Sequence, residues 1–175
     1  MPRIVGISFF NRPPLTVAEE LLGCFLCRRI GRKVVRLEIT EVEAYDGPYD
    51  KASHAHRGKT ARNAPMFGEA GRWYIYFTYG MHWMLNIVTG PRGYPAAVLI
   101  RGTKEVSGPG RLTKFLKIDR RFNTKKAHPK TGLWMEQERR VSKKLVLRTP
   151  RVGVAYAGPF WSQKPHRFVV RSGAS

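Results

Sequence analysis

The chain has 175 residues, and its 32 lysines and arginines outnumber its 12 acidic residues, which gives a formal net charge of +20 and a pI near 10.7. Hydrophobic residues make up 42% of the sequence and aromatic residues 11%. This composition excludes a disordered basic tail and predicts one folded domain over residues 1–175. No run approaches the roughly 18 consecutive apolar residues of a membrane span, and the N-terminus lacks the pattern of a signal peptide. We therefore expect an intracellular protein, in the cytoplasm and nucleoid or in a nucleus, that binds a polyanion and no membrane.

The first quarter of the chain has the pattern of one helix followed by two strands. Thr16 and Glu19 have the spacing of a reciprocal capping box, and the helix is expected to end at Gly23. Apolar residues then predict strands over 25–30 and 34–43, joined by a Gly-Arg turn.

Cys24 and Cys27 form a lone Cys-x-x-Cys pair in an apolar segment. A structural zinc site needs four ligands, and the sequence has no second cysteine pair. The spacing of His54 and His56 is not a convincing metal motif either. We interpret the cysteines as small core residues and expect no metal and no organic cofactor.

The middle of the chain predicts a loop, a hairpin and a strand. Residues 46–69 are rich in Gly, Pro, His, Arg and Asn, which is typical of a long functional loop. An aromatic β-hairpin over 72–88 follows, with Tyr79 and Gly80 at its tip, and 96–101 is expected to be a buried strand.

A second helix is expected over 111–118, with Leu112, Phe115 and Leu116 on one face, followed by strands over 151–154 and 167–171. We therefore predict a mixed α/β (α+β) domain with a curved, largely antiparallel sheet, flanking helices and a protruding β-hairpin.

Five of the 12 acidic residues gather in or beside the second strand. If that strand is regular, residues 35, 37 and 39 share a face with residues 41, 43 and 45, so that an apolar face becomes one of carboxylates and a phenol. Carboxylates weaken the binding of phosphate, so this cluster indicates chemistry on a nucleic acid. Glu41 is expected to be a salt-bridge partner. The five residues are Glu38, Glu41, Glu43, Asp46 and Asp50.

Excision of a base from DNA requires a pocket for a base rotated out of the stack, a group that fills the gap, and a group that activates water at C1′ of the sugar. Tyr45, His54 and Tyr76 are flat rings suited to the pocket, and Tyr79 is suited to the gap. Glu43 is the candidate base, because a carboxylate can accept the proton of the attacking water and stabilise an oxocarbenium ion. Arg101 is the candidate for orienting that water or the adjacent phosphate.

Seven blocks of the sequence resemble, in order, the alkyladenine (3-methylpurine) DNA glycosylase family, and the resemblance runs from about Gly6 to Arg171. Seven ordered blocks are far more specific than one motif. The blocks are Glu41 to Gly47, Ala52 to His54, Arg62 to Phe67, Tyr74 to Met81 with Asn86, Leu99 to Arg101, Ser107 to Leu112, and Arg151 to Val154.

The resemblance implies a monofunctional glycosylase that acts without a metal or cofactor, as a monomer, on double-stranded DNA. Its substrates would be damaged purines such as 3-methyladenine, 7-methylguanine, hypoxanthine and ethenoadenine. Glu43 matches the general base, Arg101 the arginine that positions the water, and Tyr79 the minor-groove wedge. By the same resemblance, Tyr45, His54, Tyr76, Leu99 and Asn86 belong to the base pocket, where the asparagine disfavours the 2-amino group of guanine.

Contacts to the DNA backbone are expected from the loop and helix beside the pocket. Backbone amides of the Gly-Pro-Gly segment could hold a phosphate, and cations flank the helix that follows. The candidates are Arg62, Gly108, Gly110, Arg111 and Lys114.

The chain departs from the family pattern at two places. Only six residues lie between Arg101 and Gly108, where family members generally have a longer segment, so DNA contacts or substrate range could differ. Ala61 stands where the family usually has proline, which could loosen the loop that contains His54.

Two other functions fit parts of the sequence. A basic structural RNA-binding protein would explain the charge but not the acidic cluster beside aromatic rings. A bifunctional glycosylase-lyase could use Pro2 as an N-terminal amine nucleophile after removal of the initiator methionine.

Overall fold

The computed structural model describes residues 1–173, and within them nine strands form a single sheet in which every strand pair is antiparallel. The main path through the sheet runs β1-β7-β2-β3-β6-β5-β4, and the β8–β9 hairpin joins β3 separately. The predicted mixed fold with a largely antiparallel sheet is confirmed. The strands are β1 (Arg3–Ile4), β2 (Phe25–Ile30), β3 (Lys33–Asp46), β4 (Trp73–Thr78), β5 (His82–Val88), β6 (Ala96–Thr103), β7 (Leu133–Gln137), β8 (Val146–Thr149) and β9 (Arg167–Val170).

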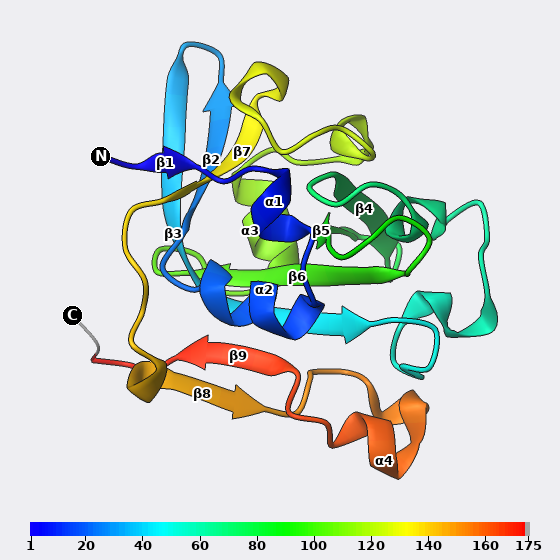
Figure 1. Cartoon of the computed structure of the whole chain (residues 1–175). Helices are drawn as coiled ribbons and strands as arrows, with labels where there is room; N and C mark the ends of the chain where they lie inside the picture. The colour runs from blue at the N-terminus through cyan, green and yellow to red at the C-terminus, as the bar shows by residue number, and fades with distance from the viewer. Residues whose placement is uncertain (174–175) are drawn as a thin grey trace.

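The helices are short, and two of them pack on the central strands. In Figure 1, α2 lies across β3 and β6, while α3 contacts β5 and β6. The helices are α1 (Ile7–Phe10), α2 (Pro14–Leu21), α3 (Pro109–Phe115) and α4 (Gly158–Ser162), with 3₁₀ turns at His54–Arg57, Ala64–Phe67, Arg120–Phe122, Pro129–Thr131, Lys143–Leu145 and Ala155–Ala157.

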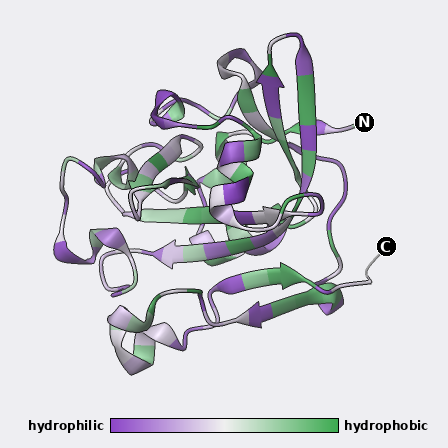
Figure 2. Ribbon diagram, turned by 180° about the vertical axis from the view of Figure 1, so that it is seen from behind, coloured by the Kyte–Doolittle hydropathy of each residue, from purple (hydrophilic) through white to green (hydrophobic). Residues whose placement is uncertain are grey.

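β3 is the longest strand, and it organises the domain. Its first half pairs with β2, and its second half lies between β6 and β9. Hydrophobic and hydrophilic residues alternate along the β2–β3 pair, as Figure 2 shows by colour, which is the pattern of strands with two different faces.

The prediction of one regular face along β3 is wrong, because the pairing of β3 with β6 shifts register between Ile39 and Val42. Leu37 and Ile39 lie in the main core, and so do Val42 and Ala44. The core-facing positions therefore change from odd to even numbers at this β-bulge. The bulge is what turns Glu43 away from the main core.

Two helix predictions need correction: the capping of the first helix, and the bounds of the second, which spans Pro109–Phe115 where 111–118 was predicted. The N-cap of α2 is Pro13, with no side-chain capping bond, so the capping box of Thr16 and Glu19 is wrong. Pro14 occupies the first turn, where a missing N–H costs nothing, and the helix therefore starts two residues before Thr16. In α3, Leu112 is fully buried, whereas Phe115 is 54% exposed and does not share its face.

The C-terminal part also differs from the prediction in one place. Residues 151–154 form a turn and no strand, because this segment is held by side-chain contacts described below; the strand lies earlier, at β8. β9 agrees with the predicted strand over 167–171. Cys24 and Cys27 are buried, as expected of core residues, and burial raises the pKa of each thiol to about 12.

Candidate active site

A cavity of about 230 Å³ opens on the face of the sheet opposite the main core, and alternate residues of four neighbouring strands line it. On β6, for example, Ala97, Leu99 and Arg101 line the cavity, whereas Val98 and Ile100 belong to the core. This alternation follows from the two-residue repeat of a strand. The volume is below the roughly 300–1,000 Å³ of pockets for drug-sized ligands, which suits a smaller planar group such as one base.

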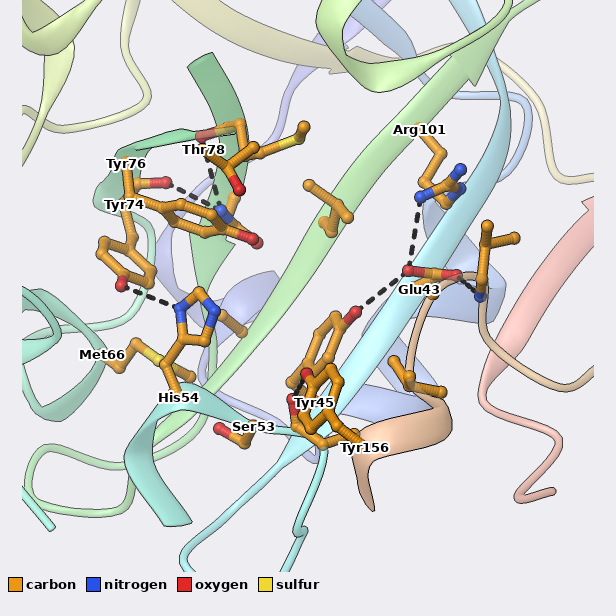
Figure 3. A pocket seen from close by; sticks show the side chains of 18 of the residues that line it. Glu43, Tyr45, Ser53, His54, Met66, Tyr74, Tyr76, Thr78, Arg101 and Tyr156 are labelled. Carbon is orange, nitrogen blue, oxygen red and sulfur yellow. Dashed lines mark hydrogen bonds and ion pairs between the residues drawn. The ribbon is translucent and has the colours of Figure 1, made fainter. Parts of the chain in front are cut away.

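Glu43 is the buried carboxylate of this cavity, with no exposed surface. Its Oε1 accepts a hydrogen bond of 3.0 Å from the Tyr45 hydroxyl, and its Oε2 accepts one of 2.6 Å from the backbone N–H of Val152. Arg101 Nη1 lies 3.6 Å from Oε1. Figure 3 shows the carboxylate between Arg101 and Tyr45.

Burial raises the pKa of Glu43, although Arg101, the Val152 N–H and the Tyr45 hydroxyl each act to lower it. Burial disfavours the charged form, while donors and a nearby cation favour it. A carboxylate whose pKa is shifted toward neutrality is a better proton acceptor at physiological pH than an ordinary surface glutamate.

Arg101 is oriented by Glu41, a second glutamate of β3. Its Nε donates a hydrogen bond of 2.9 Å to Oε1 of Glu41, and the Nε of Arg167 donates one of 2.8 Å to the same oxygen. The interpretation of Glu41 as a salt-bridge partner is confirmed. With its Nε bound to Glu41, Arg101 presents Nη1 to Glu43.

Aromatic rings form the opposite side of the cavity. The rings of His54 and Tyr76 meet edge to face with centroids 4.6 Å apart, and Tyr74 lies 5.3 Å from Tyr76. Figure 3 shows this group across the cavity from Glu43. Desolvation and the nearby charge of Arg62 lower the pKa of His54, so its imidazole is neutral at physiological pH.

Asn86 and Leu99 are paired neighbours on β5 and β6, and both line the cavity. The side-chain amide of Asn86 is buried and donates a hydrogen bond of 3.1 Å to the carbonyl of Tyr74. This bond fixes the orientation of the amide at the base of the ring cluster.

Tyr79 is at the rim of the cavity, in the turn between β4 and β5. Its side chain is 83% exposed, and its backbone has a φ of 52°, a left-handed conformation that is uncommon for a residue with a side chain. The predicted hairpin with an exposed aromatic tip is confirmed.

The residues predicted to contact a DNA backbone do not line the cavity. Arg62 donates a hydrogen bond to the carbonyl of Phe77 on the hairpin, and Arg111 and Lys114 are exposed on α3. Gly110 is buried, and a Cβ there would come within 2.6 Å of the His82 ring. Gly108 caps α3 with a φ of 99°.

Hydrogen bonds hold both segments at which the sequence departs from the family pattern. Residues 102–107 form a tight turn in which the N–H of Thr103 donates to the carbonyl of Val106 and the chain bridges back from Ser107 to Gly102. After Ala61, the Asn63 side chain donates hydrogen bonds to the carbonyls of His54 and Gly58, and these bonds hold the loop that contains His54.

Sequence reasoning missed three contributors to the site. The N–H of Val152 reaches Glu43, Arg151 pairs with Asp50 behind Tyr45, and Tyr156 lines the cavity while its hydroxyl donates to the carbonyl of Ala52. Arg151 and Val152 lie in a block that the family resemblance includes, but no local pattern reveals a backbone N–H as a ligand of a carboxylate 109 residues away.

Within residues 1–173, no group of three or more His, Cys, Asp or Glu side chains is arranged to hold a metal ion. No helix in this part of the chain is long and apolar enough to span a membrane.

The amino-acid sequence is similar to known proteins of one family. Residues 8–174 match the model of the family described as Methylpurine-DNA glycosylase. A protein of Anaeromyxobacter dehalogenans named "Putative 3-methyladenine DNA glycosylase" is 40% identical over 178 residues, covering 95% of this chain and 83% of the relative. Proteins of the same name from Methanocella arvoryzae and Myxococcus xanthus are 41% and 42% identical, covering 92% and 94% of this chain and 89% and 88% of their own lengths. The chain therefore belongs to the methylpurine-DNA glycosylase family, whose members are DNA-repair enzymes that hydrolyse N-glycosidic bonds.

Proposed function

We propose that this protein is a monofunctional glycosylase that flips alkylated or deaminated purines out of duplex DNA and hydrolyses their N-glycosidic bond with a water activated by Glu43. The observation that supports this most strongly is the fully buried carboxylate of Glu43 in a cavity that aromatic rings and Arg101 also line. The proposed substrates are 3-methyladenine, 7-methylguanine, hypoxanthine and ethenoadenine.

In the proposed reaction, the ionised Glu43 accepts a proton from water as the water oxygen bonds to C1′. The bond between C1′ and the purine nitrogen breaks, and the base leaves with the bonding electrons. The negative charge of Glu43 stabilises the oxocarbenium character of the sugar. Arg101 Nη1, which lies 3.6 Å from Glu43 Oε1, is suited to hold the water or the adjacent phosphate.

The remaining assignments belong to the same proposal. Tyr45, His54 and Tyr76 would stack on the flipped base, Leu99 and Asn86 would contact its edge, and Tyr79 would fill the space that the base leaves. Arg62, Arg111, Lys114 and the amides around Gly108 and Gly110 would contact DNA phosphates, aided by the net charge of +20.

A lyase mechanism has less support. Among the described residues, no lysine lines the cavity. Pro2 precedes β1, which is separated from β3 by β7 and β2 in the sheet. We also propose that the protein works as a monomer inside the cell, where its DNA substrate is found.

The test is single-turnover release of hypoxanthine from a 5′-labelled duplex, with a 7-methylguanine duplex run beside it. We expect strand cleavage only after alkali treatment, since a monofunctional enzyme leaves an intact abasic site. Cleavage without alkali, together with borohydride trapping of a covalent adduct, would show a lyase. No release from either duplex, with equal affinity for RNA and DNA, would support a nucleic-acid-binding protein instead.

A further inference from the structure

Arg151 and Asp50 form a fully buried ion pair beside the ring of Tyr45, the hydrogen-bond partner of Glu43. Arg151 Nη1 and Nη2 donate hydrogen bonds of 2.6 and 2.9 Å to Oδ2 and Oδ1 of Asp50, and neither side chain has any exposed surface. Such a bidentate arrangement fixes both the distance and the orientation of the two groups.

This pair joins three separate segments of the chain. Arg151 also donates a hydrogen bond of 2.9 Å to the carbonyl of Ala44 on β3, and its guanidinium lies 4.8 Å from the centroid of the Tyr45 ring. Asp50 in turn accepts hydrogen bonds from the backbone N–H groups of Asp46 and Ala52. The end of β3, the loop after it and the turn at 151–154 are therefore fixed to one another.

The turn that this pair fixes contains a ligand of Glu43. Val152 follows Arg151 directly, and its N–H donates to Oε2 of Glu43 at 2.6 Å. The Val152 side chain is 51% exposed, so it contributes little packing to hold that N–H in place. Arg151, the residue before Val152, has by contrast a fully buried side chain that is held by its pair with Asp50.

We propose that Arg151 is a positioning residue whose buried pair with Asp50 holds the Val152 N–H against Glu43 and so fixes the orientation of the catalytic carboxylate. This inference rests on the proposed role of Glu43 as the base. It assigns to Arg151 and Asp50 a part in excision without contact to the substrate.

Several groups besides the Val152 N–H face Glu43, and they set its titration together. Arg101 faces it from β6, Tyr45 from β3, Tyr76 from β4, Tyr156 from the turn before α4, and Arg151 from the 151–154 turn. His166 lies close to Arg151, whose charge contributes to lowering the pKa of this histidine, after desolvation.

Positioning and simple charge effects predict opposite results for Asp50→Asn. The acidic limb of the pH–rate profile is the range in which excision slows as Glu43 becomes protonated. Removal of the Asp50 charge leaves Arg151 unneutralised, and Coulomb attraction alone would then favour the ionised Glu43 and move this limb to lower pH. If the pair instead positions the Val152 N–H, its loss removes a hydrogen bond to the carboxylate, and the acidic limb moves to higher pH.

The experiment measures single-turnover excision of hypoxanthine from pH 5 to 8.5. We expect the acidic limb of Asp50→Asn and of Arg151→Lys to lie about one pH unit above that of the wild type, the usual consequence of losing one hydrogen bond to a charged group. At pH values below both limbs excision should fall about tenfold, while affinity for the lesion duplex should change less than threefold. An acidic limb at or below the wild-type pH in both variants would overturn the proposal.

A matched pair at the next residue tests the N–H itself and does not depend on how Asp50→Asn folds. Val152→Pro removes the N–H, and its place before Gly153 (φ 72°) in a turn suits proline; Val152→Ala keeps the N–H. We expect the limb to move to higher pH only in Val152→Pro. An equal shift in both variants, or no shift in Val152→Pro, would contradict the inference.

Two further controls separate this inference from other causes. Leu133→Ala removes a buried side chain on β7 and should destabilise the fold without moving the limb. Glu43→Gln separates the inference from the proposed function: if that variant excises normally, Glu43 is not the base and both fail. If it is inactive while Asp50→Asn has a wild-type limb, only the positioning role fails.

Discussion

The Tyr45 hydroxyl donates a hydrogen bond of 3.0 Å to Oε1 of Glu43, which lies two residues earlier on the same strand. Residues two apart on a strand face the same side, so the candidate stacking ring and the candidate base are held in a fixed relation. Burial, followed by the charge of Glu43, raises the pKa of Tyr45 well above its ordinary value. The hydroxyl therefore remains a donor throughout the pH range of an enzyme assay.

Glu43→Gln should separate binding from chemistry. The cavity keeps its shape in this variant, but an amide cannot accept the proton of water, so we expect lesion affinity within about threefold of wild type and excision at least about 100-fold slower. Gel-shift titration and single-turnover assays on the same hypoxanthine duplex measure the two effects. Wild-type turnover by the variant would exclude Glu43 as the base.

The same substitution should stabilise the protein at neutral and higher pH. Burial raises the pKa of Glu43, so the native state binds this proton more tightly than the unfolded state does. The resulting stability is present below the ordinary glutamate pKa and is lost as the pH rises through the raised pKa. We expect Glu43→Gln to unfold at a higher temperature than wild type at pH 8, and the difference to vanish near pH 4.

Glu41→Gln is the matched control for that measurement. Burial acts to raise the pKa of Glu41, but its hydrogen bonds with Arg167 and Arg101 outweigh burial and lower the pKa. Its contribution to stability is present above the ordinary pKa and is lost as the pH falls. Glu41→Gln should therefore lower the unfolding temperature at pH 8. If both variants shifted the unfolding temperature in the same direction, the opposite pKa shifts of these two glutamates would be contradicted.

Tyr79→Ala should weaken the capture of a flipped base more than the chemical step. In the role proposed for it, the exposed ring at the hairpin tip stacks where the base has left, and stacking of an aromatic ring contributes about 1–3 kcal/mol. We expect a 10-fold to 100-fold loss of affinity for duplex lesions and a smaller loss on single-stranded DNA, where little stacking is disrupted. Met81→Ala, in the same turn and 67% exposed, serves as the control.

Asn86→Ser should relax discrimination against guanine. The Asn86 amide is fixed by its bond to the Tyr74 carbonyl, so a purine with a 2-amino group meets a side chain that cannot turn aside. A shorter side chain at this buried position should raise the ratio of guanine to hypoxanthine release by about 10-fold or more. Measurement of free bases after incubation with matched duplexes gives this ratio. An unchanged ratio would show that other residues of the cavity, and not Asn86, discriminate against guanine.

Local sequence patterns predicted the elements that local forces determine. The β4–β5 hairpin, β2, β6 and β9 have clear strand patterns between turn residues, and the exposed ring of Tyr79 follows from its place at a turn. The resemblance of the seven blocks then placed Glu43, Tyr45, His54, Tyr76, Leu99, Asn86 and Arg101 at one site, and all of these side chains line one cavity.

The relations that set the chemistry of Glu43 were decided only by the tertiary structure. The bulge at Ile39 to Val42 depends on how β3 pairs with β6 and reverses the faces of the strand. The Arg151–Asp50 pair and the Val152 N–H join residues 101 and 109 positions apart. Pairing register and contacts between distant segments are fixed by the packing of the whole sheet, and no periodicity within either segment encodes them.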